Sequence, residues 1–197
     1  MRSALDEWRQ TLAALDPSAR EALLGLARRT VEAVALGGTL PVPDANLPDA
    51  LRRPGAAFVT LHAGGRLRGC IGAIEPREYS LAETIVMMAR AASREDPRFE
   101  PLRPDELRGL HVEISVLGPL VPVASADEIV VGRDGLVVEE GYRRGLLLPQ
   151  VPVEWGWDRE TFLDQTCVKA GLPPDAWRRG AQVFRFEAEV FGEPRPV

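Results

Sequence analysis

One of the two cysteines of the chain stands among residue types that can support thiol chemistry. Cys70 lies in the segment 67–72, two residues after Arg68 and directly after Gly69. Residues two apart in a β-strand point to the same face, so Arg68 and Cys70 are expected to be neighbours there. A guanidinium beside a thiol favours the thiolate, which is the nucleophilic form. We therefore take Cys70 and Arg68 as the candidate catalytic residues.

The glycines of the same segment need an explanation of their own. Gly69 and Gly72 interrupt a run with the composition of a central strand, where glycine is unfavourable unless another group must approach the backbone. A ligand is one such group, and both glycines are candidate substrate-binding residues on that interpretation. Two alternatives stay open: Cys70 is a small buried hydrophobe, as free cysteines often are, or the glycines are packing devices that the fold requires.

Two loops supply further candidates for binding a substrate. Arg98 follows the Asp-Pro dipeptide 96–97 and is restricted by its neighbours, so its guanidinium is a candidate for positioning an anionic ligand or the thiol. Trp157 belongs to the aromatic segment 155–158, which leads into a helix. Its indole is expected to act either as an apolar lid over a ligand or as a staple on the core.

Arg68 also requires a partner of opposite charge, because an unpaired guanidinium in an apolar strand must find a carboxylate or another anion. Glu113 lies on the polar face of the alternating segment 111–117 and is one candidate partner. The anionic group of a ligand is the other. Glu113 is accordingly included among the candidate substrate-binding residues.

The two histidines of the chain are the obvious bases to look for beside a thiol. If the glycine pair 64–65 forms a hairpin turn, Val59 faces Cys70 across the strands and His62 lies on the opposite face. A bulge would reverse this assignment. His111 is left free to approach from another strand. Two histidines without a cluster of acidic or cysteine ligands at metal-binding spacing predict no metal site.

The elements that must position these residues follow from periodicity and turn chemistry. Apolar runs at 57–62 and 66–74 flank the glycine pair 64–65 and predict a β-hairpin, while Ser80 and Glu83 form a capping box that begins a helix. Other expected elements are helices between 16 and 37 and between 158 and 170, and strands at 111–117, 130–131, 136–139, 144–148 and 182–191. Hairpins mixed with helices predict an α+β fold with a mostly antiparallel sheet flanked by helices.

Composition limits the class of protein. The 197 residues carry a net charge of −5 without a Lys/Arg tract, which argues against nucleic-acid binding. No apolar run approaches the roughly 20 residues of a membrane span. Two cysteines are too few for a disulfide framework, and Cys167 lies on the apolar stripe of an expected helix. The sequence therefore predicts a soluble cytoplasmic protein that does not act on membranes.

Four motifs in order make the chain resemble the AMMECR-domain family in its prokaryotic, stand-alone form. They are 67–72 followed by Pro76, 96–99 with 104–107, 148–151 with 154–157, and 167–173. The resemblance implies that residues 1–197 form a single domain with a larger and a smaller lobe, and that the 67–72 motif lies near the groove between them. It implies no settled activity, substrate or cofactor.

The resemblance also implies partners, because prokaryotic relatives are associated with a radical-SAM protein and a Memo-type protein. The chain lacks the cysteine cluster of a radical-SAM domain, so such chemistry would come from another chain. Two functions remain. One is an enzyme that acts on a small, anionic molecule or modifies a partner at a groove centred on 67–72. The other is a non-catalytic module that binds a ligand or a protein, with the motif structural.

Overall fold

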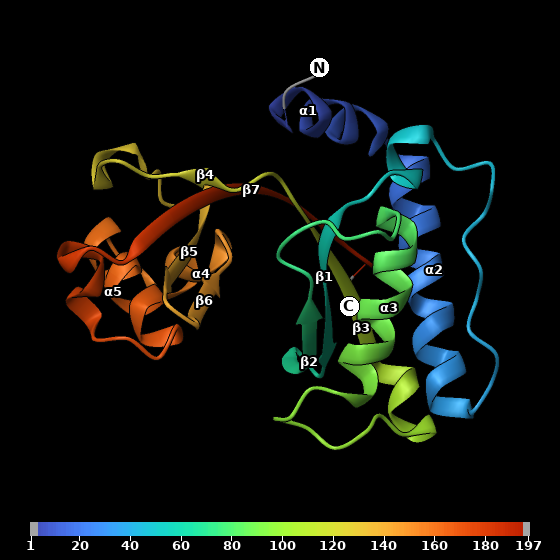
Figure 1. Cartoon of the computed structure of the whole chain (residues 1–197). Helices are drawn as coiled ribbons and strands as arrows, with labels where there is room; N and C mark the ends of the chain where they lie inside the picture. Colours follow the sequence, from blue (N-terminus) through green and yellow to red (C-terminus); the bar gives the residue numbers. More distant parts are fainter. Residues whose placement is uncertain (1–3, 195–197) are drawn as a thin grey trace. The chain divides into compact units, whose positions relative to one another are not determined.

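Two antiparallel hairpins organise the chain, one in each of the two units into which its contacts divide it. The computed structural model describes residues 4–194. One unit contains the chain up to Leu117 and again from Glu189, and the other is Gly118–Ala188. Each unit combines helices with antiparallel strands, which confirms the predicted α+β class (Figure 1). Their identity with the two lobes that the resemblance implies stays a prediction.

The predicted hairpin forms the first unit's sheet. Strands β1 (Ala56–Ala63) and β2 (Arg66–Gly72) pair antiparallel, and both turn glycines have positive φ, 56° at Gly64 and 74° at Gly65. Positive φ at both central residues is what a type I′ turn requires, and this turn matches the twist of the strands. Strand β3 (Leu110–Leu117) pairs antiparallel with β1 on its other side, so β2 is an edge strand.

Two helices cover one face of this sheet. Helix α2 (Pro17–Leu36) begins after the N-cap Asp16 and ends at Gly37, whose φ is 71°. Helix α3 (Leu81–Arg94) begins with the predicted capping box. Both helices contact the strands and each other, and Figure 1 shows them side by side along the sheet. Helix α1 (Ala4–Ala14) was not predicted, and the loop between α2 and β1 contains one turn of 3₁₀ helix, η1 (Asp49–Arg52).

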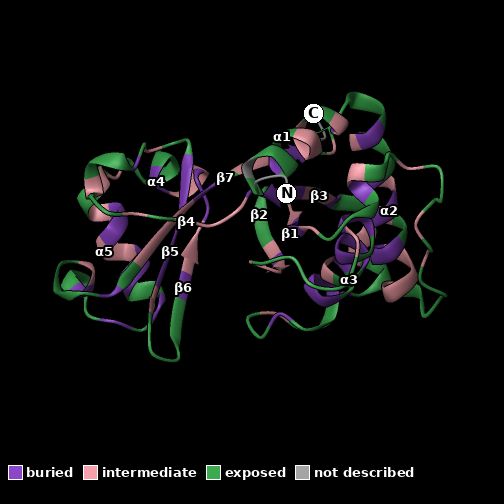
Figure 2. Ribbon diagram, turned by 45° about the horizontal axis from the view of Figure 1, so that its top comes forward, coloured by how far each residue is buried: buried purple, intermediate pink, exposed green. Residues whose placement is uncertain are grey.

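The two faces of the first unit's sheet differ: one packs into the hydrophobic core and the other is polar. One face consists of fully buried aliphatic side chains that pack on α2 and α3: Val59, Leu61, Val112, Ile114 and Val116. Figure 2 shows buried stretches, in purple, on both of these helices. Residues at alternate positions point away from the helices. The polar face predicted for 111–117 is therefore confirmed, and it continues onto β1 and β2.

The second unit is built on a second hairpin. Its elements are β4 (Val121–Pro122), η3 (Ala126–Glu128), β5 (Asp134–Glu140), β6 (Arg143–Leu147), α4 (Gln150–Trp155), α5 (Arg159–Lys169), η4 (Pro174–Arg179) and β7 (Gln182–Gly192), the last running on into the first unit. Strand β5 pairs with β6 and β7, and α5 packs on β5 and β6.

Two predictions for the second unit are wrong. Residues 130–131 form a turn rather than a strand, because the carbonyl of Val130 accepts the amides of Arg133 and Asp134. The aromatic loop expected at 155–158 is also partly wrong, because Trp155 is the last residue of the short helix α4, which Gly156 ends with a φ of 63°. In the part of the chain that the structure describes, we find no helix with the length and apolar character needed to span a membrane.

Candidate functional site

A bulge in β2 determines how the 67–72 motif presents its side chains. His62 pairs with Leu67, but the preceding residue of β1, Leu61, pairs with Gly69. Arg68 is therefore an extra residue that has no partner in the ladder. A bulge of this kind shifts the pairing of all later residues of the strand by one position. The side chain of the bulged residue, here Arg68, then no longer follows the alternation of the strand between the two faces of the sheet.

The shifted register places Cys70 opposite Thr60 rather than opposite Val59. The predicted pairing is wrong for this reason, and so is the conclusion drawn from it about His62. Because His62 lies two residues beyond Thr60 on the regular strand β1, it shares the face on which Cys70 lies. A base that the sequence excluded is thus on the correct side of the sheet.

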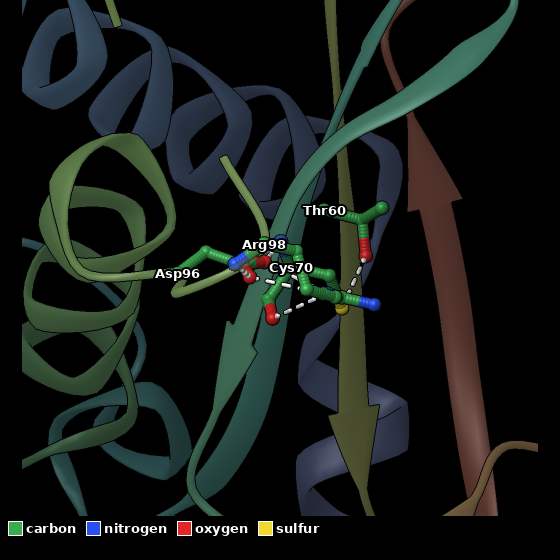
Figure 3. A network of polar contacts seen from close by, with 4 residues as sticks. All are labelled: Thr60, Cys70, Asp96 and Arg98. Carbon is green, nitrogen blue, oxygen red and sulfur yellow. Dashed lines mark hydrogen bonds and ion pairs between the residues drawn. The ribbon is translucent and has the colours of Figure 1, made fainter. Parts of the chain in front are cut away.

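Five polar side chains form two rows on this face. Cys70, Thr60 and Glu113 stand opposite one another across β2, β1 and β3, and His62 and His111 form the adjacent row. The Thr60 hydroxyl donates to the Cys70 sulfur at 3.3 Å, as Figure 3 shows. The imidazole centroids are 6.1 Å apart. A thiol, a hydroxyl, a carboxylate and two imidazoles therefore share one face of strands β1, β2 and β3.

The open edge of β2 is closed beside Cys70 by an ion pair (Figure 3). The Cys70 amide donates to the Asp96 carboxylate at 2.8 Å, and Arg98 donates to the same carboxylate from Nε at 2.9 Å and from Nη2 at 2.7 Å. The Arg98 Nη2 also lies 3.5 Å from the Cys70 carbonyl oxygen. The Asp96 side chain is 2% exposed, and the Arg98 guanidinium lowers the pKa of this carboxyl to about 2.

The thiol is protonated at neutral pH in this environment. Burial raises the pKa of Cys70, and the negative charges of Asp96 and Glu113 act in the same direction. The hydrogen bond from Thr60 and the positive charge of Arg98 oppose the rise without cancelling it. Thiolate formation at this site therefore needs a base.

Arg68 is held by the segment that follows α3. Its Nε and Nη2 donate to the two carboxylate oxygens of Glu106 at 2.6 and 2.9 Å, and its Nη2 donates to the Glu100 carbonyl at 3.0 Å. Glu106 belongs to a turn of 3₁₀ helix, η2 (Pro104–Gly109). This two-bond contact is the strong arrangement for a guanidinium and a carboxylate, and it lowers the pKa of Glu106.

Two predictions about Arg68 are corrected by this contact. Its carboxylate partner is Glu106 and not Glu113, because the bulge turns the guanidinium towards η2. Arg68 is also not among the groups that shift the pKa of Cys70, which is raised and not lowered. A catalytic role for Arg68 beside the thiol thus loses the geometry on which it was predicted.

The glycines of the motif make room for protein atoms. A Cβ at Gly69 would overlap the carbonyl oxygen of Ala92 in the last turns of α3, and a Cβ at Gly72 would overlap the ring of Phe58. These contacts support the interpretation of the glycines as packing devices. A substrate-binding role for Gly69 and Gly72 stays a prediction.

The remaining candidates lie in the second unit. Trp157 is half-buried, stacks with Trp155 at a centroid distance of 6.1 Å, and packs on a core that contains Phe162. This is the staple that one interpretation predicted, and its substrate-binding role stays a prediction. Cys167 is fully buried in the same unit, in agreement with its position on an apolar helical stripe.

Four residues of the site were not predicted: Thr60, His62, Asp96 and Glu106. The polar alternation on β1 was a usable signal for the first two, but the roles of Asp96 and Glu106 depend on where the chain returns after α3. Within residues 4–194, no cluster of three or more histidine, cysteine or acidic side chains has the arrangement of a metal site.

Comparisons with known proteins agree with this description. The AMMECR1 family model matches residues 24–191. A protein of Thermococcus gammatolerans is 49% identical over 187 residues, which cover 89% of this chain and 91% of the relative. A protein of Methanothermobacter thermautotrophicus is 48% identical over 179 residues, 87% of this chain and 92% of the relative. The crystal structure of the uncharacterized protein PH0010 from Pyrococcus horikoshii superposes with a TM-score of 0.88 at 43% identity, covering 93% and 95% of the two chains.

Proposed function

The chain belongs to the AMMECR1 family, and we propose that it is an enzyme in which Cys70 attacks an electrophilic carbon of a small molecule or of a partner protein. One observation supports this most directly. The register of β1, β2 and β3 gathers Cys70, Thr60 and Glu113 in one row and puts His62 in the next. Such a combination of nucleophile and acid–base groups is what covalent catalysis requires.

His62 is the base that this arrangement favours. Histidine is the side chain that acts most often as a general base in enzymes. His62 is the diagonal neighbour of Cys70 on the sheet face, a separation that an aromatic side chain can span. Glu113 stands in the same row as the thiol and provides the alternative base.

The covalent step conserves atoms and charge. The S–H bond of Cys70 breaks and its proton passes to the His62 imidazole, while the sulfur electron pair forms a bond to a carbonyl carbon of the substrate. The bond from that carbon to its leaving group breaks, and the leaving group departs with the electron pair and takes the proton back from His62. The products are a thioester on Cys70 and the protonated leaving group.

Trapping of this thioester tests the function. The protein is incubated with p-nitrophenyl esters and thioesters of carboxylic acids of graded size and charge, and adducts are located by mass spectrometry. We expect acylation at Cys70 that saturates with ester concentration, and a loss of about 10²-fold in rate in His62→Gln. Cys167→Ser is the matched control and should acylate as the wild type does.

Two results would contradict the proposal. One is acylation of Cys70 no faster than that of a free cysteine with every ester. The other is an unchanged rate in both His62→Gln and Glu113→Gln, because no base would then act on the thiol.

A second function has its own support. Arg68 and both glycines of the motif are used in contacts within the protein, so the motif is also explained as part of a module that binds a ligand or protein without chemistry. Saturable binding without acylation would favour that module. The radical-SAM and Memo-type partners remain proposals that the family resemblance alone supports, and no cofactor is assigned.

A further inference from the structure

A pocket of about 350 Å³ lies beside the outer edge of β2, within the first unit. Three guanidinium groups line it, those of Arg68, Arg98 and Arg103. The acidic side chains among the lining residues are Glu100 and Glu106, and two further carboxylates, Asp96 and Asp105, form ion pairs with Arg98 and Arg103. The pocket lies where Arg98 approaches the backbone of Cys70, but its lining does not include the thiol.

Carboxylates fix two of these arginines without using all their donors. Arg68 gives Nε and Nη2 to Glu106, and Arg98 gives Nε and Nη2 to Asp96. A guanidinium has five N–H donors, and the Nη1 group of each has no hydrogen-bond acceptor among residues 4–194. Both also lie over the ring of Phe99, at 5.8 and 5.5 Å from its centroid.

Fixed guanidinium groups with spare donors are suited to a negatively charged ligand. Most of the entropy of ordering the side chains is lost on folding and not on binding, so a ligand gains more from each contact. The Glu106 and Asp96 carboxylates occupy one edge of each fork, and the Nη2 groups also contact the carbonyl oxygens of Glu100 and Cys70, so the Nη1 groups are left for an external oxygen. Cation–π contacts with the Phe99 ring also help to fix the guanidinium groups of Arg68 and Arg98.

We propose that this pocket binds a small oxyanion, a phosphate or a carboxylate group, through the Nη1 groups of Arg68 and Arg98, with Arg103 as a third cation at the rim. The pocket binds its anion whether or not Cys70 is a nucleophile. Because Arg98 also touches the Cys70 carbonyl, a bound anion offsets the positive charge of Arg98 that acts on the thiol.

Isothermal titration with pyrophosphate, inorganic phosphate and citrate at low ionic strength tests the site. We expect saturable one-to-one binding of at least one of them, and none of chloride at the same ionic strength. Binding of pyrophosphate without citrate identifies a phosphate ligand, and the reverse identifies a carboxylate. Absence of binding by all three overturns the proposal.

Arg103 provides a variant that leaves the fold intact, because its side chain is 73% exposed. Arg103→Gln should weaken binding about fivefold to tenfold, the effect of one charge-assisted contact. Arg108→Gln removes the same charge from an exposed position of η2 outside the pocket, and should change the affinity by less than about twofold. Equal weakening by both variants would show a general charge effect and overturn the site.

A variant that lacks the Cys70 thiol distinguishes this binding site from the proposed enzymatic function. Cys70→Ser should bind the anion with unchanged affinity, so a failure of the acylation test leaves the pocket standing. In the wild type, a saturating anion should slow the alkylation of Cys70 by iodoacetamide at pH 7.5, because Arg98 no longer favours the thiolate. An unchanged alkylation rate at saturation would place the anion away from Arg98 and overturn the proposed contact.

Discussion

Replacing Asp96 with asparagine removes one buried negative charge from the edge of β2. Its carboxylate accepts from the amides of Cys70 and Arg98 and from two nitrogens of the Arg98 guanidinium, at 2.7 to 3.1 Å. An amide has nearly the same shape, but its NH₂ group would face donors where the carboxylate now accepts. The variant therefore tests the charge while it preserves the volume.

The pKa of Asp96 sets the magnitude. A fall of this pKa from 3.8 to about 2 corresponds to about 2 to 3 kcal/mol of stabilisation of the folded state by the ionised form. Since the pKa is lower in the folded state, this stabilisation is fully present above about pH 4 and is lost as the pH falls towards 2. We expect Asp96→Asn to unfold with about 2 to 3 kcal/mol less free energy at pH 6, and expect the difference to shrink towards pH 2.

Urea unfolding at pH 6, 4 and 2.5 measures this difference, and amide hydrogen exchange at Cys70 reports it locally, since that amide donates to Asp96. Asp105→Asn is the matched control, because its ion pair with Arg103 is more than 70% exposed on both sides. It should change stability by less than about 0.5 kcal/mol. A deficit in Asp96→Asn below that value at pH 6, or one that is independent of pH, would refute the reasoning.

Three further outcomes are expected. Gly69→Ala should cost at least about 2 kcal/mol in urea unfolding, because its methyl group overlaps a backbone oxygen of α3, whereas Gly109→Ala, with open space around it, should stay within about 0.5 kcal/mol. Arg68→Lys should lower the melting temperature by a few degrees, because an ammonium cannot replace the two-bond contact with the η2 carboxylate; an unchanged temperature would contradict that contact. Arg98→Gln should slow the alkylation of Cys70 about threefold at pH 7.5, because the pKa of the thiol rises further when this cation is lost, and a faster rate would reverse the sign that we assign.

Local signals in the sequence were sufficient to predict most elements near the site. The glycine pair 64–65, the capping box at Ser80 and Glu83, and the alternation at 111–117 each act over a few residues, and each element forms as expected. The register of β2 was not predictable in this way. Counting back from the turn assumes an unbroken ladder, and the bulge at Arg68 depends on contacts with η2, more than 30 residues later in the chain.

Three features of the site are linked in the structure: the bulge at Arg68, the glycine at position 69, and the ion pair of Asp96 with Arg98. Gly69 has no Cβ, so the last turns of α3 come into direct contact with β2 at Ala92. The chain leaving α3 then reaches the strand edge within four residues, where Asp96 accepts the Cys70 amide. The two segments 67–72 and 96–99 therefore depend on each other for their positions. Their effect is to fix the backbone of Cys70 through the hydrogen bond from its amide to Asp96. The thiol lies with Thr60 on the polar face of the sheet, which is the face away from α3.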